Sequence, residues 1–123
     1  MRFLLDTNVL IWSIAEALKP ETLDTLADPE NDLFVSDVSL WELAIKTGLG
    51  KIQTPPDLDE QMERLGMKGV QLNRTHIAAY RDLPLLHRDP FDRMLVAQAK
   101  VENLILVTRD RMLADYDITV LPC

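Results

Sequence analysis

The clearest local signal in the chain is the stretch Arg88-Asp89-Pro90-Phe91-Asp92-Arg93-Met94-Leu95-Val96-Ala97-Gln98-Ala99. Proline suits the first turn of a helix, because its φ is fixed at a helical value and its missing N–H has no partner to lose there. Asp89 is therefore expected to cap a helix that begins at Pro90. Asp92 shares a face of that helix with three apolar residues, Leu95, Val96 and Ala99. The stretch thus predicts a carboxylate on the core-facing side of a helix, which is costly without a partner or a cation.

Three further acids are set among apolar residues in a similar way. Asp6 ends the apolar run Phe3–Leu5, and Asp110 follows the apolar run Leu104–Thr108. Glu42 lies in the helix expected after a second strand, on a face that is otherwise apolar. The apolar residues of that face are Val38, Trp41 and Ile45.

Short apolar segments alternate with amphipathic helical segments along the whole chain. The expected strands are Phe3–Leu5, Leu33–Ser36, Val70–Leu72, Leu104–Thr108 and Ile118–Leu121. The expected helices begin near Thr7, Pro20, Asp37, Asp57, Thr75 and Pro90, and a last turn spans Arg111–Asp115. Continuously apolar strands are typical of a parallel sheet covered on both faces. We therefore expect an α/β fold, a three-layer α/β/α sandwich around a mostly parallel central sheet, with one domain over residues 1–123.

The four acids are expected to meet at one edge of this sheet. Asp6 and Asp110 lie at the carboxyl ends of two strands, where parallel sheets form their sites. Glu42 lies in the second turn of the helix after the second strand, and Asp92 lies near the start of the helix before the fourth. Four carboxylates in one pocket repel one another and cannot all stay ionised without cations.

Such a cluster has a specific chemistry. Hard oxygen ligands favour Mg²⁺ or Mn²⁺ over zinc. Two such ions roughly 4 Å apart stabilise both the attacking and the leaving oxygen in phosphodiester cleavage, with water as the nucleophile. Arg93 and Arg109 are candidates for a bidentate contact to a substrate phosphate. Asn8 and Thr108 are either ordinary cap and strand residues or hydrogen-bond partners of the carboxylates.

Composition narrows the classes of protein. The formal charge is −7, with net −9 over residues 1–63 and net +2 over residues 64–123, which disfavours non-specific coating of nucleic acid but not a nuclease. No apolar run approaches the length of a membrane span, and a charge comes too early at the start for a secretory leader. Cys123 is the single cysteine, so an internal disulfide is excluded and a cytoplasmic location is expected.

These residues resemble the PIN-domain ribonucleases, and among them the VapC-type toxins of bacterial toxin–antitoxin pairs. The resemblance rests on four pieces in order, Leu5-Asp6-Thr7-Asn8, Ser39-Leu40-Trp41-Glu42, His87–Arg93 with Ala97-Gln98-Ala99, and Val107-Thr108-Arg109-Asp110. It implies a Mg²⁺- or Mn²⁺-dependent endoribonuclease that hydrolyses RNA. It also implies a homodimer held inactive by a cognate VapB-like antitoxin. By position, Asp6, Glu42, Asp92 and Asp110 match the family's acidic quartet.

Each acid also has a purely structural interpretation. Asp6 can serve as a helix cap, Glu42 can pair with Lys46, and Asp110 can be a turn residue. Asp92 can pair with a neighbouring arginine, Arg88 or Arg93. His87 is expected in a loop and His76 on a solvent-facing helix surface, and both tryptophans are expected in the core.

Two other functions compete with the nuclease. A receiver-like phosphoacceptor domain has a similar length, but it requires adjacent acids after the first strand and a lysine after a late strand. This chain has Thr7-Asn8 and Pro122-Cys123 at those places. A catalytically silent PIN-like binding module is expected to lack some of the four acids, and none is missing.

Overall fold

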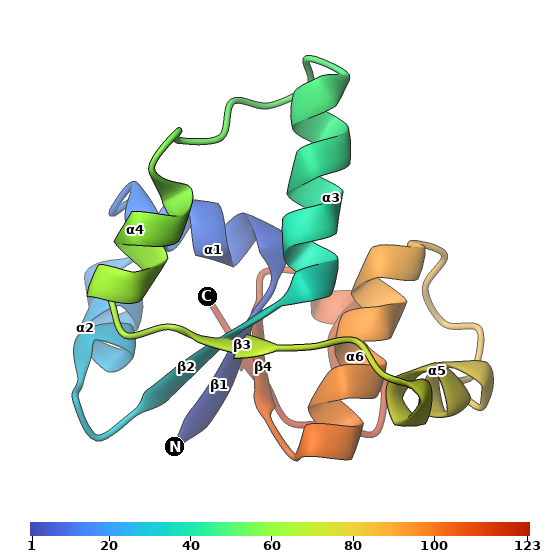
Figure 1. The fold of residues 1–123 in the computed structure, drawn as a ribbon. Coiled ribbons are helices and arrows are strands. Elements are labelled where there is room, and N and C mark those ends of the chain that lie inside the picture. Colours follow the sequence, from blue (N-terminus) through green and yellow to red (C-terminus); the bar gives the residue numbers. More distant parts are fainter.

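The computed structural model describes residues 1–123 and contains a five-stranded sheet with helices on both faces (Figure 1). The strands are β1 (Arg2–Leu5), β2 (Asp32–Ser36), β3 (Lys68–Val70), β4 (Ile105–Thr108) and β5 (Val120–Pro122). Their order is β3-β2-β1-β4-β5, and every pairing is parallel. The expected α/β/α sandwich is confirmed, and its sheet is wholly parallel.

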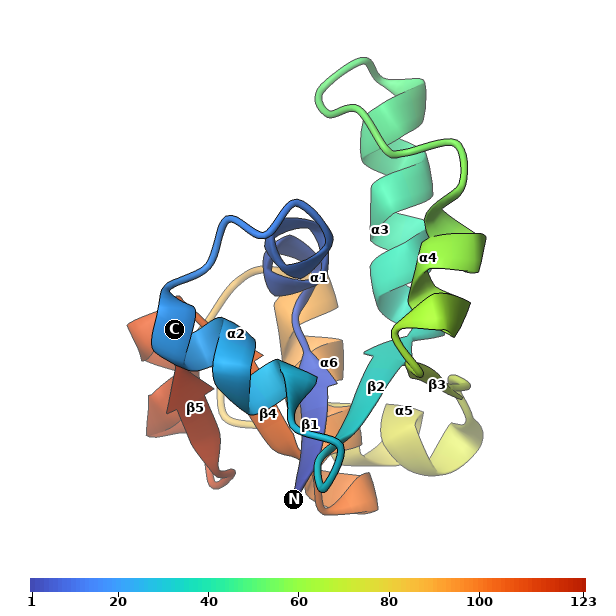
Figure 2. The same ribbon diagram turned by 90° about the vertical axis from the view of Figure 1, so that its left-hand side faces the viewer.

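The helices form two outer layers. They are α1 (Thr7–Ile14), α2 (Pro20–Ala27), α3 (Asp37–Gly48), α4 (Leu58–Arg64), α5 (Arg74–Arg81) and α6 (Pro90–Glu102), followed by the 3₁₀ helix η1 (Arg111–Asp115). Helices α1, α2 and α4 lie on one side of the sheet, and α5 and α6 lie on the other (Figures 1 and 2). Helix α3 extends beyond the carboxyl edge of the sheet and packs against both α1 and α6.

The strand β1 supplies both apolar layers because successive side chains point to opposite faces. Phe3 and Leu5 join a core cluster with residues of α1, α2 and β2, whereas Leu4 joins a second cluster with Leu95 and Val96 of α6. All of these side chains are almost completely buried. Both faces of the sheet are therefore buried, as its continuously apolar strands predict.

The strand order reverses between β1 and β4, which are adjacent in the sheet. Leu5 is in register with Val107, and the N–H of Asp6 donates to the carbonyl of Val107 at 3.1 Å. The chain therefore leaves both strands at the same edge, with Asp6 after one and Asp110 shortly after the other. This is the switch point at which open parallel sheets place their sites.

Side-chain caps start the helices near the site. Asp89 Oδ1 accepts the N–H of Phe91 at 2.8 Å and that of Asp92 at 3.3 Å, so the predicted cap of α6 is confirmed. Ser36 caps α3 in the same way. The cap of α1 is Asp6, which accepts the N–H of Val9 at 2.8 Å. Its structural interpretation as a cap is therefore confirmed.

The third strand lies earlier than Val70–Leu72, the range expected from the sequence. Gly66 has a positive φ of 69° and turns the chain directly from α4 into β3 at Lys68. Val70 is buried at the end of the strand, whereas Leu72 is exposed. A short strand with a single buried residue leaves too weak a pattern to fix its bounds.

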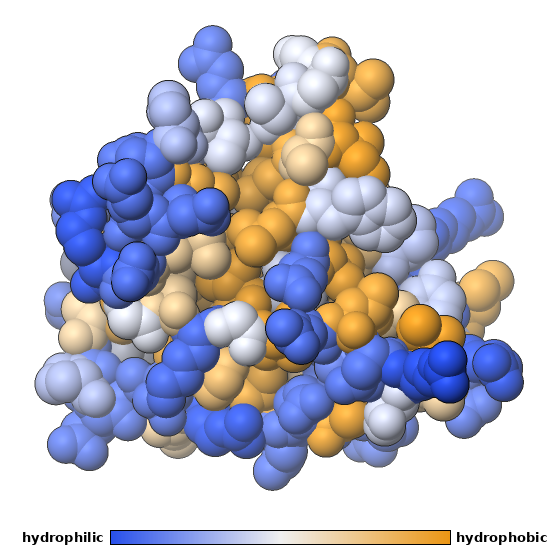
Figure 3. Space-filling view, viewed as in Figure 1, coloured by the Kyte–Doolittle hydropathy of each residue, from blue (hydrophilic) through white to orange (hydrophobic).

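No helix in the structure has the length and apolar character needed to span a membrane. Apolar side chains nevertheless gather on one face, between α3 and α4 (Figure 3).

Candidate active site

The four predicted acids come from four different elements that meet at the carboxyl edge of the sheet. Asp6 follows β1, Glu42 lies on α3, Asp92 lies in the first turn of α6, and Asp110 follows β4. They lie close enough to act on one another electrostatically. The charges of Glu42 and Asp110 help to raise the pKa of Asp6, and those of Asp6 and Glu42 help to raise the pKa of Asp92.

Asp6 is buried, with 7% of its surface exposed. The hydroxyl of Thr108 donates to its Oδ2 at 2.6 Å, while its Oδ1 caps α1. Burial raises the pKa of Asp6, and the nearby acids raise it further, whereas these two hydrogen bonds oppose the rise. The carboxylate is thus fixed in orientation but poorly compensated in charge.

Glu42 is also buried, with 5% of its surface exposed. The hydroxyl of Thr7 donates to its Oε1 at 2.7 Å and lies 3.0 Å from Ser39 Oγ. Its Oε2 forms an ion pair with Lys46, one helical turn further along α3. The structural interpretation of Glu42 as a partner of Lys46 is therefore correct, and the same carboxylate still belongs to the acidic cluster.

Asp92 is the least compensated of the four. No hydrogen-bond donor contacts its carboxylate, and the side-chain nitrogen recorded near it, His87 Nε2, lies 3.7 Å from Oδ2. No ion pair links it to either arginine that the sequence suggested. Burial, followed by the charges of Asp89, Asp6 and Glu42, raises the pKa of Asp92 to about 7, although His87 opposes the rise. Such a strongly shifted carboxyl in a cluster of acids is typical of a functional site.

Asp110 caps η1 through Oδ1, which accepts the N–H of Met112 at 3.0 Å. Its Oδ2 lies 2.7 Å from His87 Nε2, and its own N–H donates to the hydroxyl of Thr108 at 3.0 Å. Thr108 therefore links Asp110 to Asp6, which confirms the hydrogen-bonding alternative for this threonine. His87, Asp92 and Asp110 lie close enough to share one metal ion.

The two arginines predicted to bind phosphate differ in placement. Arg93 is buried, and its Nη1 donates to Pro84 O at 2.9 Å and to the Tyr116 hydroxyl at 3.1 Å. Its guanidinium also lies over the ring of Tyr80. These contacts are on the side of α6 that faces α5, so the placement of Arg93 argues against a phosphate contact.

Arg109 fits a substrate role better. It is exposed beside Asp110, and its guanidinium stacks on the ring of Trp12 at 4.0 Å. Asn8 is exposed in the first turn of α1, and no side-chain hydrogen bond joins it to the acids. Asn8 is therefore left as a candidate for contact with the substrate rather than with the carboxylates.

The sequence-based placement of both histidines needs correction. His76 is completely buried rather than solvent-facing, because it forms a capping box with Asn73 and contacts Glu102 at 2.9 Å. His87 does lie in a loop, but its ring points at Asp110 and Asp92. The only sequence signal for this role is its position two residues before the cap Asp89, and the contact with Asp110 spans 23 residues.

Trp41 is exposed rather than buried, with 59% of its surface accessible. Its ring contacts that of Phe91 edge-on at 5.2 Å, next to the acidic cluster. Trp12 is half-buried and packs against the first core cluster, close to its expected place.

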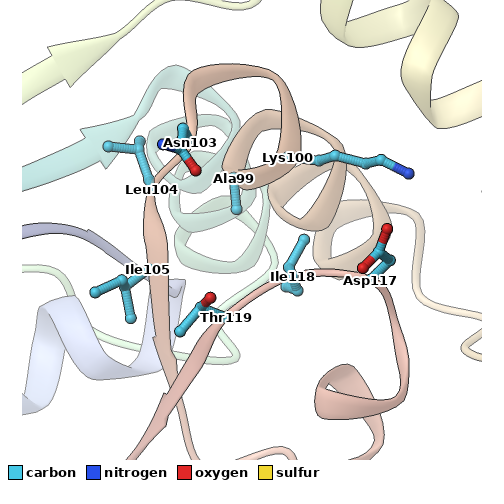
Figure 4. A pocket seen from close by; sticks show the side chains of 8 residues that line it. All are labelled: Ala99, Lys100, Asn103, Leu104, Ile105, Asp117, Ile118 and Thr119. Carbon is cyan, nitrogen blue, oxygen red and sulfur yellow. The ribbon is translucent and has the colours of Figure 1, made fainter.

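A pocket of about 320 Å³ lies elsewhere in the molecule, between the end of α6 and the segment before β5 (Figure 4). Its lining includes Leu104 and Ile105 at the amino end of β4, whereas the acids lie beyond the carboxyl end. Lys100 and Asp117 are its only charged residues. This pocket has no cluster of catalytic groups and is not the candidate site.

Comparison with known proteins identifies the family to which the fold belongs. The sequence model of the PIN-domain family matches residues 3–118, so the chain belongs to this family. PIN domains are typically metal-dependent nucleases. No curated protein sequence matches the chain.

Several solved structures share the fold at low identity. A chain of VapBC2 from Rickettsia felis, solved with a DNA fragment from its promoter, has a TM-score of 0.75 at 19% identity, covering 99% of this chain and 98% of that one. A chain of DNA-bound VapBC from Salmonella typhimurium has a TM-score of 0.69 at 18% identity, with the same coverage. A chain of VapBC-1 from nontypeable Haemophilus influenzae has a TM-score of 0.66 at 17% identity, and the match again covers 99% of this chain and 98% of that one.

The donor set of the site suits a hard divalent cation. Carboxylate oxygens are the ligands that Mg²⁺ and Mn²⁺ prefer, and no cysteine lies among them. The carboxylate of Asp92 accepts no hydrogen bond although it is largely buried, so it retains its full capacity as a ligand. The residues present therefore fit such an ion.

Proposed function

We propose that this protein is a Mg²⁺- or Mn²⁺-dependent endoribonuclease, the toxin component of a toxin–antitoxin pair. The observation that carries the proposal is the convergence of Asp6, Glu42, Asp92 and Asp110 at the switch point of the sheet. Membership of the PIN-domain family supports the nuclease class. The similarity in fold to chains of VapBC complexes supports the toxin role.

The acids are proposed to hold the metal through their carboxylate oxygens. When bound, such ions activate a water molecule and stabilise the charge that develops on the phosphate and the leaving oxygen. The surrounding residues keep the carboxylates in place beforehand. Thr108 orients Asp6, and Thr7 orients Glu42. Catalysis is faster when the polar groups of the site are already in position and need not move during the reaction.

Arg109 is proposed to contact the RNA backbone. Its guanidinium is exposed at the carboxyl edge of the sheet, and stacking on Trp12 restricts its motion. A cation is needed there because the acidic cluster repels phosphate. Arginine can present two donors to one phosphate, which fixes the direction of the strand.

Two protein partners are proposed with the toxin role, a VapB-like antitoxin and a second copy of the chain. Exposed apolar side chains support an interface, since Trp41 and Ile45 of α3 and Leu49, the residue after its last turn, recur every four residues. Leu65, the residue that follows the last turn of α4, is also half exposed. Apolar surface of this kind marks interaction sites.

The test is cleavage of a panel of labelled RNAs, including transfer and ribosomal RNA, by purified protein in Mn²⁺. Asp6→Asn, purified in parallel, and a reaction with EDTA are the controls. The proposal predicts cutting by the wild type that is absent from both controls. If the whole panel stays intact with folded, metal-loaded wild type, the protein is a silent binding module of the PIN fold.

A further inference from the structure

We propose that His87 is a positioning residue of the metal centre, which orients Asp110 through an Nε2–H hydrogen bond and does not itself bind the metal. This inference rests on the proposed metal-dependent function, because it assigns a role within that site. The contact that introduces it is His87 Nε2 to Asp110 Oδ2 at 2.7 Å.

The tautomer of His87 follows from its other ring nitrogen. The backbone N–H of Asp89 donates to His87 Nδ1 at 3.0 Å. A backbone N–H can only donate, so Nδ1 must be the nitrogen without a proton. Neutral imidazole carries one proton, which is therefore on Nε2. The ionised carboxylate of Asp110 can only accept a hydrogen bond. Nε2–H is therefore the donor and Asp110 Oδ2 the acceptor.

The same polarity argues against His87 as a direct ligand. A histidine that binds a metal uses an unprotonated nitrogen and donates the proton of the other to a carboxylate or a carbonyl. Binding through Nε2 would move the proton to Nδ1, where it would meet the N–H of Asp89 head-on. Although His87, Asp92 and Asp110 lie close enough to surround one ion, the backbone at Asp89 thus favours support over ligation.

The loop that carries His87 is held by buried groups of a different part of the chain. The N–H of His87 donates to the Tyr116 hydroxyl at 3.0 Å, and Arg93 donates to the same hydroxyl at 3.1 Å. Arg93 also donates to Pro84 O at 2.9 Å, near the start of the loop. Arg93 and Tyr116 are buried, with 6% and 3% of their surfaces exposed. The chain of contacts therefore runs from the interior of α6 through Tyr116 to His87 and ends on Asp110.

This network gives Arg93 a role that its sequence position does not suggest. Arg93 holds the loop in place through its hydrogen bonds and does not contact a substrate phosphate. Asp110 consequently receives a donor on each oxygen, from His87 on Oδ2 and from Met112 on Oδ1. Each carboxylate oxygen has two lone pairs, so both remain able to contact a metal.

The first test is the tautomer of His87 in the metal-free protein, measured by long-range ¹H–¹⁵N correlation NMR at neutral pH. The proposal predicts a protonated Nε2 and an unprotonated Nδ1. The opposite tautomer would overturn it. His76, the only other histidine, is assigned by comparison with His87→Gln.

The second test is the affinity for Mn²⁺, measured by calorimetry and by the EPR signal of the free ion. We expect His87→Leu to weaken binding by about 10- to 100-fold, as the loss of an outer hydrogen bond does in metal sites. His87→Gln, which retains an N–H donor of similar reach, should recover most of the affinity. Leu85→Ala, a neutral change on the same loop at a residue that is 83% exposed, is the matched control and should bind like the wild type.

Three results separate this inference from the proposed function. Equal Mn²⁺ affinities of wild type and folded His87→Leu, or a directly coordinated ¹⁴N in the pulsed EPR of the wild-type complex, would overturn the positioning role alone. Binding of Mn²⁺ with the predicted loss in His87→Leu, but without RNA cleavage by the wild type, would overturn the nuclease and keep the positioning role.

Discussion

Thr108 donates a hydrogen bond of 2.6 Å from its hydroxyl to Oδ2 of Asp6, across the boundary between β4 and β1. The two residues are 102 positions apart in sequence. The same hydroxyl accepts the N–H of Asp110 at 3.0 Å. One side chain thus couples the acids that follow two adjacent strands, and it does so where the strand order of the sheet reverses.

Replacing Thr108 by valine tests this coupling, because the change keeps the shape and removes the hydroxyl. The carboxylate of Asp6 then loses its closest donor in a buried place. We expect a loss of about 1 kcal/mol in the free energy of unfolding and a loss of about 10- to 100-fold in Mn²⁺ affinity. Thr108→Ser, which keeps the hydroxyl, is the control for chemical denaturation and calorimetry. Equal metal affinities for the two variants would show that the hydroxyl does not support the site.

Asp92→Asn should abolish cleavage while leaving the metal-free protein at least as stable as the wild type. The reason is that burial and three neighbouring acids disfavour the charge of Asp92, so removing the charge relieves repulsion. Thermal unfolding in EDTA measures the effect, and circular dichroism checks the fold. A clear fall in Tm would mean that the charge of Asp92 is needed for folding, contrary to a clustered metal site.

Divalent metal should stabilise the wild type more than Asp92→Asn. A ligand that binds only the folded state adds about 2.7 kcal/mol when its concentration is a hundred times Kd. The measurement is the rise in Tm with Mn²⁺ or Mg²⁺ at one ionic strength, with Ca²⁺-free buffer and EDTA as the baseline. If wild type and variant gain the same number of degrees, the metal binds elsewhere on the acidic surface.

The stability of the metal-free protein should depend on pH through Asp92. The folded state has a pKa of about 7 at this carboxyl, against an ordinary value of 3.8. Between these values the folded state binds a proton that the unfolded state releases, so the contribution of Asp92 to stability falls as pH rises. We therefore expect the advantage of Asp92→Asn over the wild type to be larger at about pH 8 than at about pH 5.

Denaturant titrations of both proteins in EDTA at the two pH values give this difference directly. Taking the difference cancels the titration of groups that lie far from Asp92 and that the variant leaves in place. An advantage that is constant with pH, or larger at the acidic value, would contradict the raised pKa.

The exposed apolar stripe formed by Trp41, Ile45 and Leu49 should support a dimer. The monomer mass is 14.0 kDa, and light scattering after size exclusion should give about twice that value for the wild type. Ile45→Arg places a charge in the middle of the stripe and should yield a monomer. Leu85→Arg, at an exposed apolar residue in the loop between α5 and α6, is the matched control and should remain dimeric. A wild-type monomer would leave the stripe for the other proposed partner, the antitoxin.

Much of the fold could be predicted because its signals are local. The capping aspartate Asp89 with Pro90 marks the start of α6, and the apolar runs before Asp6 and Asp110 mark β1 and β4. Parallel pairing then places those two acids at one edge. The predicted bounds of the third strand are wrong because its single buried residue, Val70, gives no periodic pattern.

The parts of the site that the sequence could not predict depend on contacts between distant residues. Arg93 looks like a substrate contact beside Asp92, but the hydroxyl of Tyr116 and the carbonyl of Pro84 hold it inside the fold. The sequence gives no sign of a partner for His87, because Asp110 lies 23 positions away and only the fold brings the two residues together. Helix periodicity places Trp41 in the core, whereas α3 extends past the edge of the sheet and leaves the ring exposed.

Anomalous scattering of Mn²⁺ in crystals of the wild-type protein would locate the metal directly. We expect a strong peak within ligand distance of Asp6 and Asp92, at the carboxyl edge of the sheet, and its loss in crystals of Asp92→Asn. A peak confined to other acidic groups, or no peak in crystals equilibrated with saturating Mn²⁺, would contradict the assignment of the four carboxylates to one metal centre.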